Sequence, residues 1–318
     1  MSMQLLVLHD TRYDYAAPVS LAHHLAHLQP LQDAAQQLLD FKLSLFPAAA
    51  QCRDSADSMG NAQCHFSLTQ GHRSLQVQAR SWVRLQARFA QLQAEAAPAW
   101  ETVAARLRYA AQPHFEPAIE FAMPSPYVPR LPALREYAAP SLLPGRPVAL
   151  VALDLMQRIH RDFQYQSQST QVETPLAQVL QQRRGVCQDF AHLMAGALRM
   201  WGLPARYVSG YLLTHAPLGE QGAGRAMQGA DASHAWVQVW CPGTPGVPAD
   251  GWLDLDPTNN LVPGSGHVRV AIGRDFGDVT PLRGVIRGGG RHTLTVGVST
   301  RQLPGAHSGF QQDPELLQ

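Results

Sequence analysis

An apolar stripe at helical spacing constrains the fold of this chain more than any other feature. Residues 187–201 repeat apolar side chains on one face: Phe190, Leu193, Met194, Ala197, Leu198 and Trp201. Gly202 follows, and glycine is the residue that most often ends a helix. Three segments with strand-like composition come next, at 206–213, 235–240 and 251–256. A helix followed by adjacent strands predicts an α+β core in which the helix packs on an antiparallel sheet.

The rest of the chain divides into three parts by pattern. Residues 1–85 alternate polar and apolar side chains, most regularly from 74 to 85, which predicts an N-terminal β domain of the sandwich type. Residues 86–145 are rich in Ala, Gln and Pro, and the prolines limit this connector to short helices. Residues 146–318 are predicted to form the core unit, including further strands near the C-terminus.

Composition excludes several classes of function. The formal net charge is +1 and no long Lys/Arg run occurs, so neither a nucleic acid nor an acidic membrane is an expected partner. No apolar run reaches 18 residues, and the N-terminus lacks the pattern of a signal peptide. We therefore expect a cytoplasmic protein.

The four cysteines do not form a disulfide framework. They lie irregularly at positions 52, 64, 187 and 241. Cys52 and Cys64 could face each other across a hairpin, but a reducing compartment disfavours a disulfide there.

Cys187 stands where a helix begins. A thiol on the first turn faces unpaired N–H groups and the positive end of the helix dipole, and both favour the nucleophilic thiolate. Gly185, just before it, would permit close approach of a substrate. The competing interpretation is a buried structural cysteine.

His234 opens the second strand-like segment, and two aspartates lie in the third. His234 shares one strand face with Trp236, while Asp254 and Asp256 share a face of the next strand. Adjacent antiparallel strands would place one carboxylate beside the imidazole and fix its tautomer. Taken singly, the histidine could be a surface residue and Asp256 the first residue of a turn. Together with Cys187 they give the nucleophile, base and orienting group of thiol acyl transfer.

Four blocks in this order resemble the motifs of bacterial transglutaminase-like proteins, within the papain-like thiol enzymes. They are Gly-Val-Cys-Gln-Asp-Phe-Ala-His (185–192), Leu-Arg-Met-Trp-Gly-Leu-Pro-Ala-Arg-Tyr-Val-Ser-Gly-Tyr (198–211), His-Ala-Trp-Val (234–237) and Gly-Trp-Leu-Asp-Leu-Asp-Pro-Thr (251–258). Residues 9–15 and 59–61 are similar to the N-terminal β domain of that family, and residues 273–284 to its C-terminal segment.

The resemblance implies roles for individual residues. It places the nucleophile at Cys187, the base at His234 and the orienting carboxylate at Asp256, since the aspartate of the family precedes Pro-Thr. For the oxyanion, Tyr165 and Gln188 are candidates beside the Cys187 N–H. Four further residues match motif positions and are expected to be structural, with Arg206 binding loop carbonyls and the tryptophans lining the cleft: Arg199, Arg206, Trp236 and Trp252.

The expected function is acyl transfer on peptide or carboxamide bonds through a thioester, without a metal or an organic cofactor. Water as acceptor gives a protease or amidase, which we favour; an amine gives a protein-glutamine transglutaminase. A non-catalytic peptide-binding module is a further possibility. So is a metal site using Cys187 with His192 or His234 with Cys241, although compact ligand pairs are lacking. The expected partner is a peptide or protein substrate, and the resemblance also implies peptide-ligase-like partner proteins.

A glycine-rich segment, 219–229, separates the first two core strands. It has no apolar pattern, which predicts a mobile loop beside His234.

Overall fold

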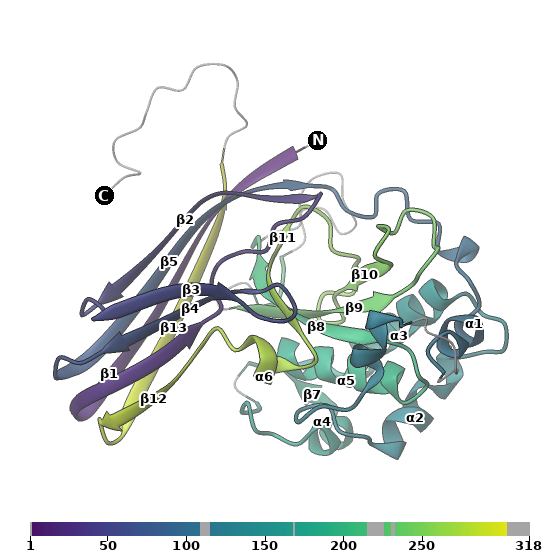
Figure 1. Ribbon diagram of the computed structural model, residues 1–318. Coiled ribbons are helices and arrows are strands. Elements are labelled where there is room, and N and C mark those ends of the chain that lie inside the picture. The colour runs from purple at the N-terminus through teal and green to yellow at the C-terminus, as the bar shows by residue number, and fades with distance from the viewer. Residues whose placement is uncertain (1, 109–114, 168, 215–225, 230–232, 304–318) are drawn as a thin grey trace.

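The computed structural model describes residues 2–108, 115–167, 169–214, 226–229 and 233–303. A β-sheet body and a mixed α/β body lie side by side (Figure 1). Within the described ranges no helix is both long and apolar enough to cross a membrane.

The β-sheet body is an antiparallel sheet with seven strands among the described residues. The first five strands of the chain pair in the order β2-β5-β1-β4-β3, and the last two pair with β1. The strands are β1 (Ser2–Ala26), β2 (Gln36–Phe46), β3 (Gln51–Ala56), β4 (Ala62–Leu68), β5 (His72–Gln86), β12 (Leu282–Gly288) and β13 (His292–Gln302).

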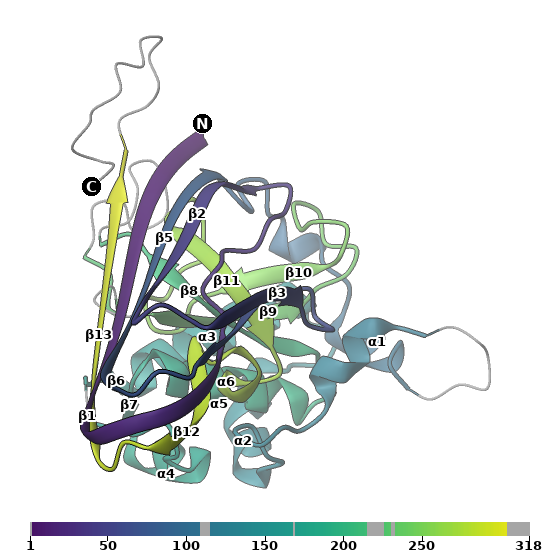
Figure 2. The ribbon, with the colours of Figure 1, turned by 60° about the vertical axis from the view of Figure 1, so that its left-hand side comes forward.

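This sheet folds over because the long strand β1 takes part in both of its halves. Residues 2–14 of β1 pair with β5, whereas residues 22–26 pair with β4, and the register shifts between the two. Figure 2 shows β1 turning at this level. Apolar side chains from both halves, among them Val19, Phe66 and Val77, form one buried cluster. The result is the sandwich-like packing expected from the alternating sequence, although the two layers are joined through shared hydrogen bonds.

The C-terminal strands differ from the expected division of the chain. The sequence assigned them to the core unit, but β12 pairs with residues 19–26 of β1 and β13 with residues 5–15. Without them, one edge of the 25-residue β1 would present unpaired N–H and C=O groups along its length. Residues 282–302 therefore belong to the N-terminal sheet.

The connector contains only short helices within its described residues. They are η1 (Ala94–Ala96), α1 (Trp100–Ala105), η2 (Pro117–Ala122), α2 (Pro132–Ala138) and η3 (Ala139–Ser141). Proline occupies the first turn in the last three, where its missing N–H costs no hydrogen bond.

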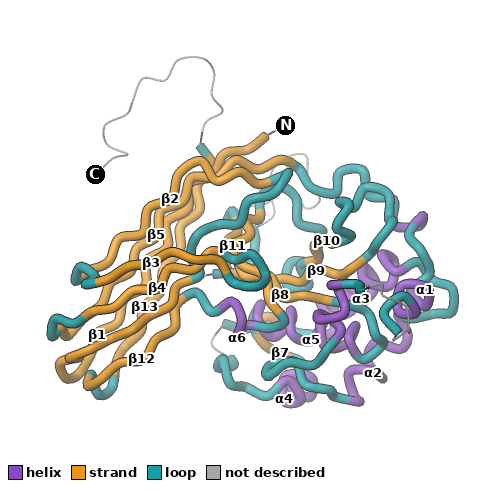
Figure 3. Tube along the Cα trace, viewed as in Figure 1, coloured by secondary structure: helices purple, strands orange, loops and turns teal. Residues whose placement is uncertain are grey.

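The α/β body places helix α5 (Cys187–Arg199) on a four-stranded antiparallel sheet (Figure 3). The sheet order is β10-β9-β8-β11. Every α5 residue from Asp189 to Arg199 is buried, which explains the apolar stripe. The remaining elements are α3 (Val148–Asp162), β6 (Gln164–Tyr165), α4 (Leu176–Gln182), β7 (Arg184–Gly185), β8 (Ala205–Leu212), β9 (His234–Trp240), β10 (Trp252–Leu255), β11 (His267–Gly273) and α6 (Phe276–Val279).

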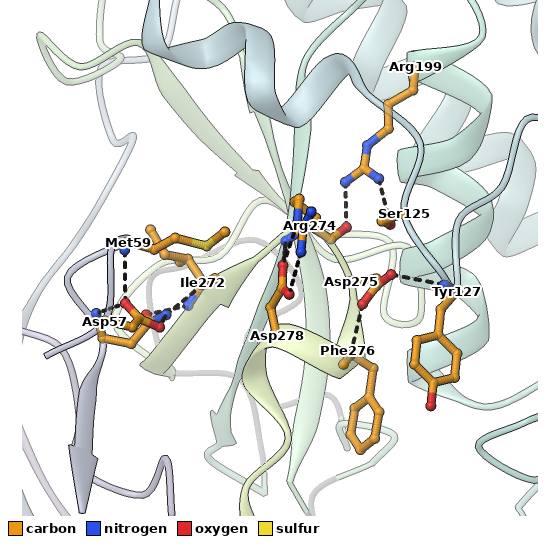
Figure 4. Close-up of polar contacts among 12 residues, drawn as sticks. Asp57, Met59, Ser125, Tyr127, Arg199, Ile272, Arg274, Asp275, Phe276 and Asp278 are labelled. Atoms are coloured by element: carbon orange, nitrogen blue, oxygen red, sulfur yellow. Dashed lines mark hydrogen bonds and ion pairs between the residues drawn. The ribbon is translucent and has the colours of Figure 1, made fainter.

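Polar side chains join the two bodies. Asn61, in the turn between β3 and β4, donates to the carbonyl of Ile272 and accepts from its N–H, both at 2.8 Å (Figure 4). On β1, His9 Nδ1 lies 2.9 Å from the Tyr211 hydroxyl of β8. Each contact ties a segment of one body to a strand of the other, so the bodies form one unit.

Candidate functional site

The first turn of α5 is held by a carboxylate three residues into the helix. Asp189 Oδ2 accepts from the Val186 N–H at 2.8 Å and from the Thr170 hydroxyl at 2.6 Å. A Cβ atom on Gly185 would lie 2.7 Å from Asp189 Oδ2. The glycine expected to admit a substrate therefore makes room for this carboxylate. Cys187, the first residue of the helix, remains partly exposed.

His234 is the first residue of β9 and is bound by Asp256. Its Nε2 lies 2.9 Å from Asp256 Oδ2, and both side chains are fully buried. In the ladder, Trp252 pairs with Trp240 and Leu255 with Val237. Asp256 is therefore carried to the end of β9 where His234 lies, as adjacent antiparallel strands require.

The Asp256 carboxylate accepts five hydrogen bonds from described residues. Oδ2 accepts from the side chains of His234, His267 at 3.1 Å and Asn259 at 2.9 Å. Oδ1 accepts from the backbone N–H groups of Thr258 and Asn259. Burial by itself raises the pKa of Asp256, but the two imidazoles outweigh it and hold that pKa far below its usual range. The carboxylate is thus a fixed negative charge behind His234.

His267 reaches Asp256 from the strand at the opposite edge of the sheet. It begins β11, and β8 lies between β11 and β9. The β8 residue opposite His234 is Gly210, where a Cβ would lie 2.5 Å from the Trp236 ring. Because Gly210 has no side chain, Trp236 can lie across β8 and contact the His267 ring, with centroids 5.2 Å apart.

Asp254, the other carboxylate on that face, serves a different partner. It pairs with Gln238 in the ladder, farther along β9 from His234. Its Oδ2 accepts from Arg269 Nε at 3.0 Å in a buried ion pair. Of the two aspartates, the structure brings only Asp256 to His234.

The second ring nitrogen of His234, Nδ1, is buried and forms no hydrogen bond of standard geometry with a described residue. Burial lowers the pKa of His234, but Asp256 and, to a smaller extent, the Cys187 thiol outweigh burial and raise it to about 10. Cys187 is therefore one of the groups that act on the charge of His234.

Gly229, in the described segment 226–229, lies against the imidazole. Asn259 Oδ1 accepts from the Gln228 N–H at 2.8 Å, and Asn259 Nδ2 donates to the Gln228 carbonyl at 3.3 Å. Gly229 adopts φ +85°, and a Cβ there would lie 2.7 Å from His234 Nδ1. The same asparagine thus holds both Asp256 and this segment. Most of the predicted mobile loop, 219–225 and 230, lies outside the described residues.

The oxyanion candidates are placed differently. Tyr165 pairs with Gly185 in the short β6–β7 ladder, so its backbone lies beside the approach to Cys187. Gln188 Nε2 lies 3.5 Å from the Val172 carbonyl, a long contact.

Neither tryptophan lines a cleft. Trp236 is 0% exposed. Trp252 is 6% exposed, with its ring against Phe121 of η2 and the Arg206 guanidinium 4.1 Å above it. Both tryptophans belong to the packed interior. Other elements of the chain cover the sheet face that was expected to border a cleft.

The carbonyl-binding role expected of Arg206 belongs to the other motif arginine, Arg199. Arg199 binds backbone carbonyls, donating to Ala205 at 2.7 Å and to Arg274 at 2.5 Å (Figure 4 shows the Arg274 contact). Arg206 instead donates to Gln238 Oε1 and covers Trp252. Both are structural, as expected, but it is Arg199 that ties the loops.

The residues weighed as metal-ligand pairs have different roles. His192 Nε2 accepts from the Phe276 N–H, and Cys241 is fully buried, which raises the pKa of its thiol. His234, Asp256 and His267 do bring three ligand atoms within 4.8 Å of one another. The two imidazoles lie 2.9 and 3.1 Å from Asp256 Oδ2, which are hydrogen-bond lengths.

Three residues that contact the site were not anticipated: Gly229, Asn259 and His267. Asn259 could have been found, since it follows Asp-Pro-Thr directly and an asparagine there can bond to neighbouring backbone. His267 carries no local signal among 14 histidines.

Comparison with known proteins identifies the family of this chain. Residues 143–257 match the transglutaminase-like superfamily, and residues 5–84 match the bacterial transglutaminase-like N-terminal region. An uncharacterised protein of Mycobacterium tuberculosis is 40% identical over 88% of this chain and 86% of its own length. A protein-glutamine gamma-glutamyltransferase of Pseudomonas aeruginosa is 35% identical over 37% of this chain and 17% of its own length.

A solved structure shares the whole fold. A protein from Cytophaga hutchinsonii, provisionally described as a cysteine protease, superposes with a TM-score of 0.70 at 21% identity, covering 98% of this chain and 95% of the other. This likeness extends over both bodies and supports a papain-like arrangement of helix and sheet. The chain belongs to the transglutaminase-like superfamily.

Proposed function

We propose that this protein is a cysteine-dependent acyl-transfer enzyme with Cys187 as nucleophile, His234 as general base and Asp256 as orienting carboxylate. The observation that carries the proposal is the His234 Nε2–Asp256 Oδ2 contact of 2.9 Å. This contact fixes the ring so that Nδ1 remains for proton transfer with the thiol at the start of α5. Interaction of Cys187 with the His234 charge supports the same pairing.

The reaction follows from these positions. The Cys187 sulfur attacks an amide carbonyl, and the N–H groups at the start of α5 stabilise the oxyanion. His234 delivers its proton to the leaving nitrogen as the C–N bond breaks, which leaves a thioester on Cys187 and a neutral amine or ammonia. Water or an amine then attacks the thioester, gives a proton to His234 and releases the thiolate.

We favour water as the acceptor. Water needs no binding site of its own, whereas transamidation requires that an amine be held near the thioester and that water be excluded. The substrate class is therefore a peptide bond or a glutamine carboxamide, cleaved by hydrolysis. Protein crosslinking is the second candidate, since it would proceed through the same thioester.

One assay separates these activities. Glutamine-containing peptides are incubated with the protein with and without a fluorescent primary amine, and ammonia, peptide fragments and incorporated amine are measured. Hydrolysis predicts ammonia or fragments without incorporation, while crosslinking predicts incorporation. Cys187→Ala and His234→Ala should abolish either product, whereas Cys52→Ser, which removes an exposed thiol on β3, should not.

A non-catalytic peptide-binding module would behave differently. Its Cys187 would react with iodoacetamide no faster than a simple thiol, and the His234→Ala variant would react at the same rate as the wild type. That result would sink the enzyme proposal.

A further inference from the structure

The hairpin formed by β3 and β4 holds two cysteines side by side, away from the candidate site. Cys52 Sγ and Cys64 Sγ are 2.9 Å apart. Asp54 pairs with Cys64 in the ladder, and Cys52 precedes Asp54 by two residues, so the three side chains share one face. Cys52 is exposed, whereas Cys64 is 8% exposed and belongs to the apolar cluster of the sheet.

The sulfur separation favours a covalent bond. A disulfide has an S–S length of about 2.05 Å, so closing it requires an approach of about 0.9 Å. The strand β3 can move by this amount because it is the outermost strand of its sheet and all six of its residues are exposed. Cys64 stays fixed by its core contacts.

Metal binding is the weaker interpretation of the same cluster. The cluster offers three ligand atoms, from Cys52, Asp54 and Cys64. Structural zinc is held by four protein ligands, predominantly thiolates and imidazoles.

We propose that Cys52 and Cys64 form a redox-active pair that a low-molecular-weight disulfide converts into an intrachain disulfide. The exposed Cys52 attacks as the thiolate, forms a mixed disulfide and releases one thiolate of the reagent. Cys64 then loses its proton and its sulfur attacks the Cys52 sulfur, which releases the second thiolate. Two protein thiols are oxidised by two electrons, and one reagent disulfide is reduced to two thiols.

The bond would stiffen the hairpin that joins the two bodies. Beyond the cysteines, the turn at residues 57–61 is held by Asp57 Oδ1, which accepts from the N–H groups of Met59 and Asn61. Asn61 binds both backbone groups of Ile272 on β11 (Figure 4). A crosslink between the two strands of this ladder removes open conformations of the hairpin. Amide exchange in residues 57–61 should slow when the disulfide forms.

The test uses the full chain in a Cys187→Ala background, so that the site thiol cannot react with the reagent. The protein is incubated with glutathione disulfide, remaining thiols are alkylated, and tryptic peptides are analysed without reduction. Arg53 lies between the cysteines, so the expected product is peptide 43–53 linked to peptide 54–73, which separates on reduction. Intact protein should lose two hydrogen masses and carry no glutathione.

Two matched variants make the result decisive. Adding Cys52→Ser changes only an exposed side chain, should retain the fold and should abolish the link; Cys64→Ser should leave a glutathione adduct on Cys52. Hydrogen exchange of residues 57–61 should be at least several-fold slower in the oxidised protein than in the reduced protein. If protein with both Cys52 and Cys64 yields only glutathione adducts, the proposed disulfide is wrong. If hydrogen exchange of residues 57–61 is the same in the oxidised and reduced protein, the stiffening role is wrong. Neither outcome depends on the activity of Cys187.

Discussion

His234 and His267 both donate through Nε2 to the same oxygen of Asp256, at 2.9 Å and 3.1 Å. His234 lies on β9 and His267 on β11, and β8 lies between these two strands. The Asp256 carboxylate is therefore held by side chains from two strands that are not neighbours. The centroids of the two imidazole rings are 6.2 Å apart, so His267 acts on His234 through the shared carboxylate. A second imidazole donor on Oδ2 keeps the carboxylate ionised and limits its rotation.

Replacing His267 with Phe should therefore impair chemistry while preserving the ring contact with Trp236. Loss of one hydrogen bond to a buried charge costs about 1.5–3 kcal/mol, so kcat should fall roughly 10- to 100-fold with little change in KM. The pKa of Asp256 should rise, and the acidic limb of the pH–rate profile should move to higher pH. Steady-state kinetics across the acidic range measure both effects.

His192→Phe is the matched control, since His192 is also a buried histidine with aromatic neighbours. It leaves the Phe276 N–H without its acceptor, so it should lower stability without moving the pH–rate profile. Equal pH shifts in the two variants would contradict a specific effect of His267 on Asp256.

The two aspartates of the third core strand should separate activity from stability. Asp256→Asn removes the charge behind His234 and disturbs its tautomer, so kcat should fall at least about 100-fold in a folded protein. Asp254→Asn removes the negative charge that pairs with the buried Arg269. It should lower the unfolding free energy by about 3 kcal/mol and leave kcat unchanged. Urea denaturation and kinetics of both variants test this. The reverse pattern would assign the orienting role to Asp254.

Local patterns predicted the elements that carry the site. The apolar stripe of 187–201 places Cys187 at a helix start, because helical spacing reports which face is buried. Strand-like alternation predicted two consecutive strands carrying His234 and Asp256. In the structure the ladder between β9 and β10 brings the two residues together. These relationships involve elements close in sequence, so their geometry follows from periodicity.

Relationships between distant elements did not follow from the sequence. His267 reaches Asp256 only because β11 lies next to β8, an adjacency that no local pattern encodes. Trp252 was expected to line a cleft, but Phe121 of the proline-rich connector packs on it. The pairing of β13 with β1 joins residues about 290 positions apart, and no local sequence pattern predicts it.

Gly229 should be intolerant of any side chain. Its φ of +85° disfavours other residues, and an added Cβ would press on His234 Nδ1 at 2.7 Å. Gly229→Ala should therefore displace the imidazole or the segment, with kcat reduced by at least about tenfold.

Gly243→Ala separates backbone strain from contact with the imidazole. Gly243 has φ +73°, and its added Cβ would meet only a Pro98 side-chain atom, at 3.9 Å. This variant should lose about 1 kcal/mol of stability and keep its kcat. If both glycine variants lost stability alike and kept full activity, Gly229 would not shape the site.

The charge of His234 predicts how stability depends on pH. Its pKa in the folded protein is about 10, above the ordinary 6.5, so its protonated form stabilises the fold; this contribution is complete below pH 6.5 and is lost as pH rises through 10. Asp256 has the opposite sign: its contribution is complete above its ordinary pKa of 3.8 and is lost as pH falls through its lower folded value. The difference in unfolding free energy between wild type and His234→Ala should therefore be largest at about pH 4–6.5 and decline toward pH 10. Cys187→Ala removes one of the groups that raise the pKa of His234, so in that background the decline should be complete at lower pH. Urea melts across this range measure both curves, and a difference that grows with pH would show that His234 is neutral in the folded protein.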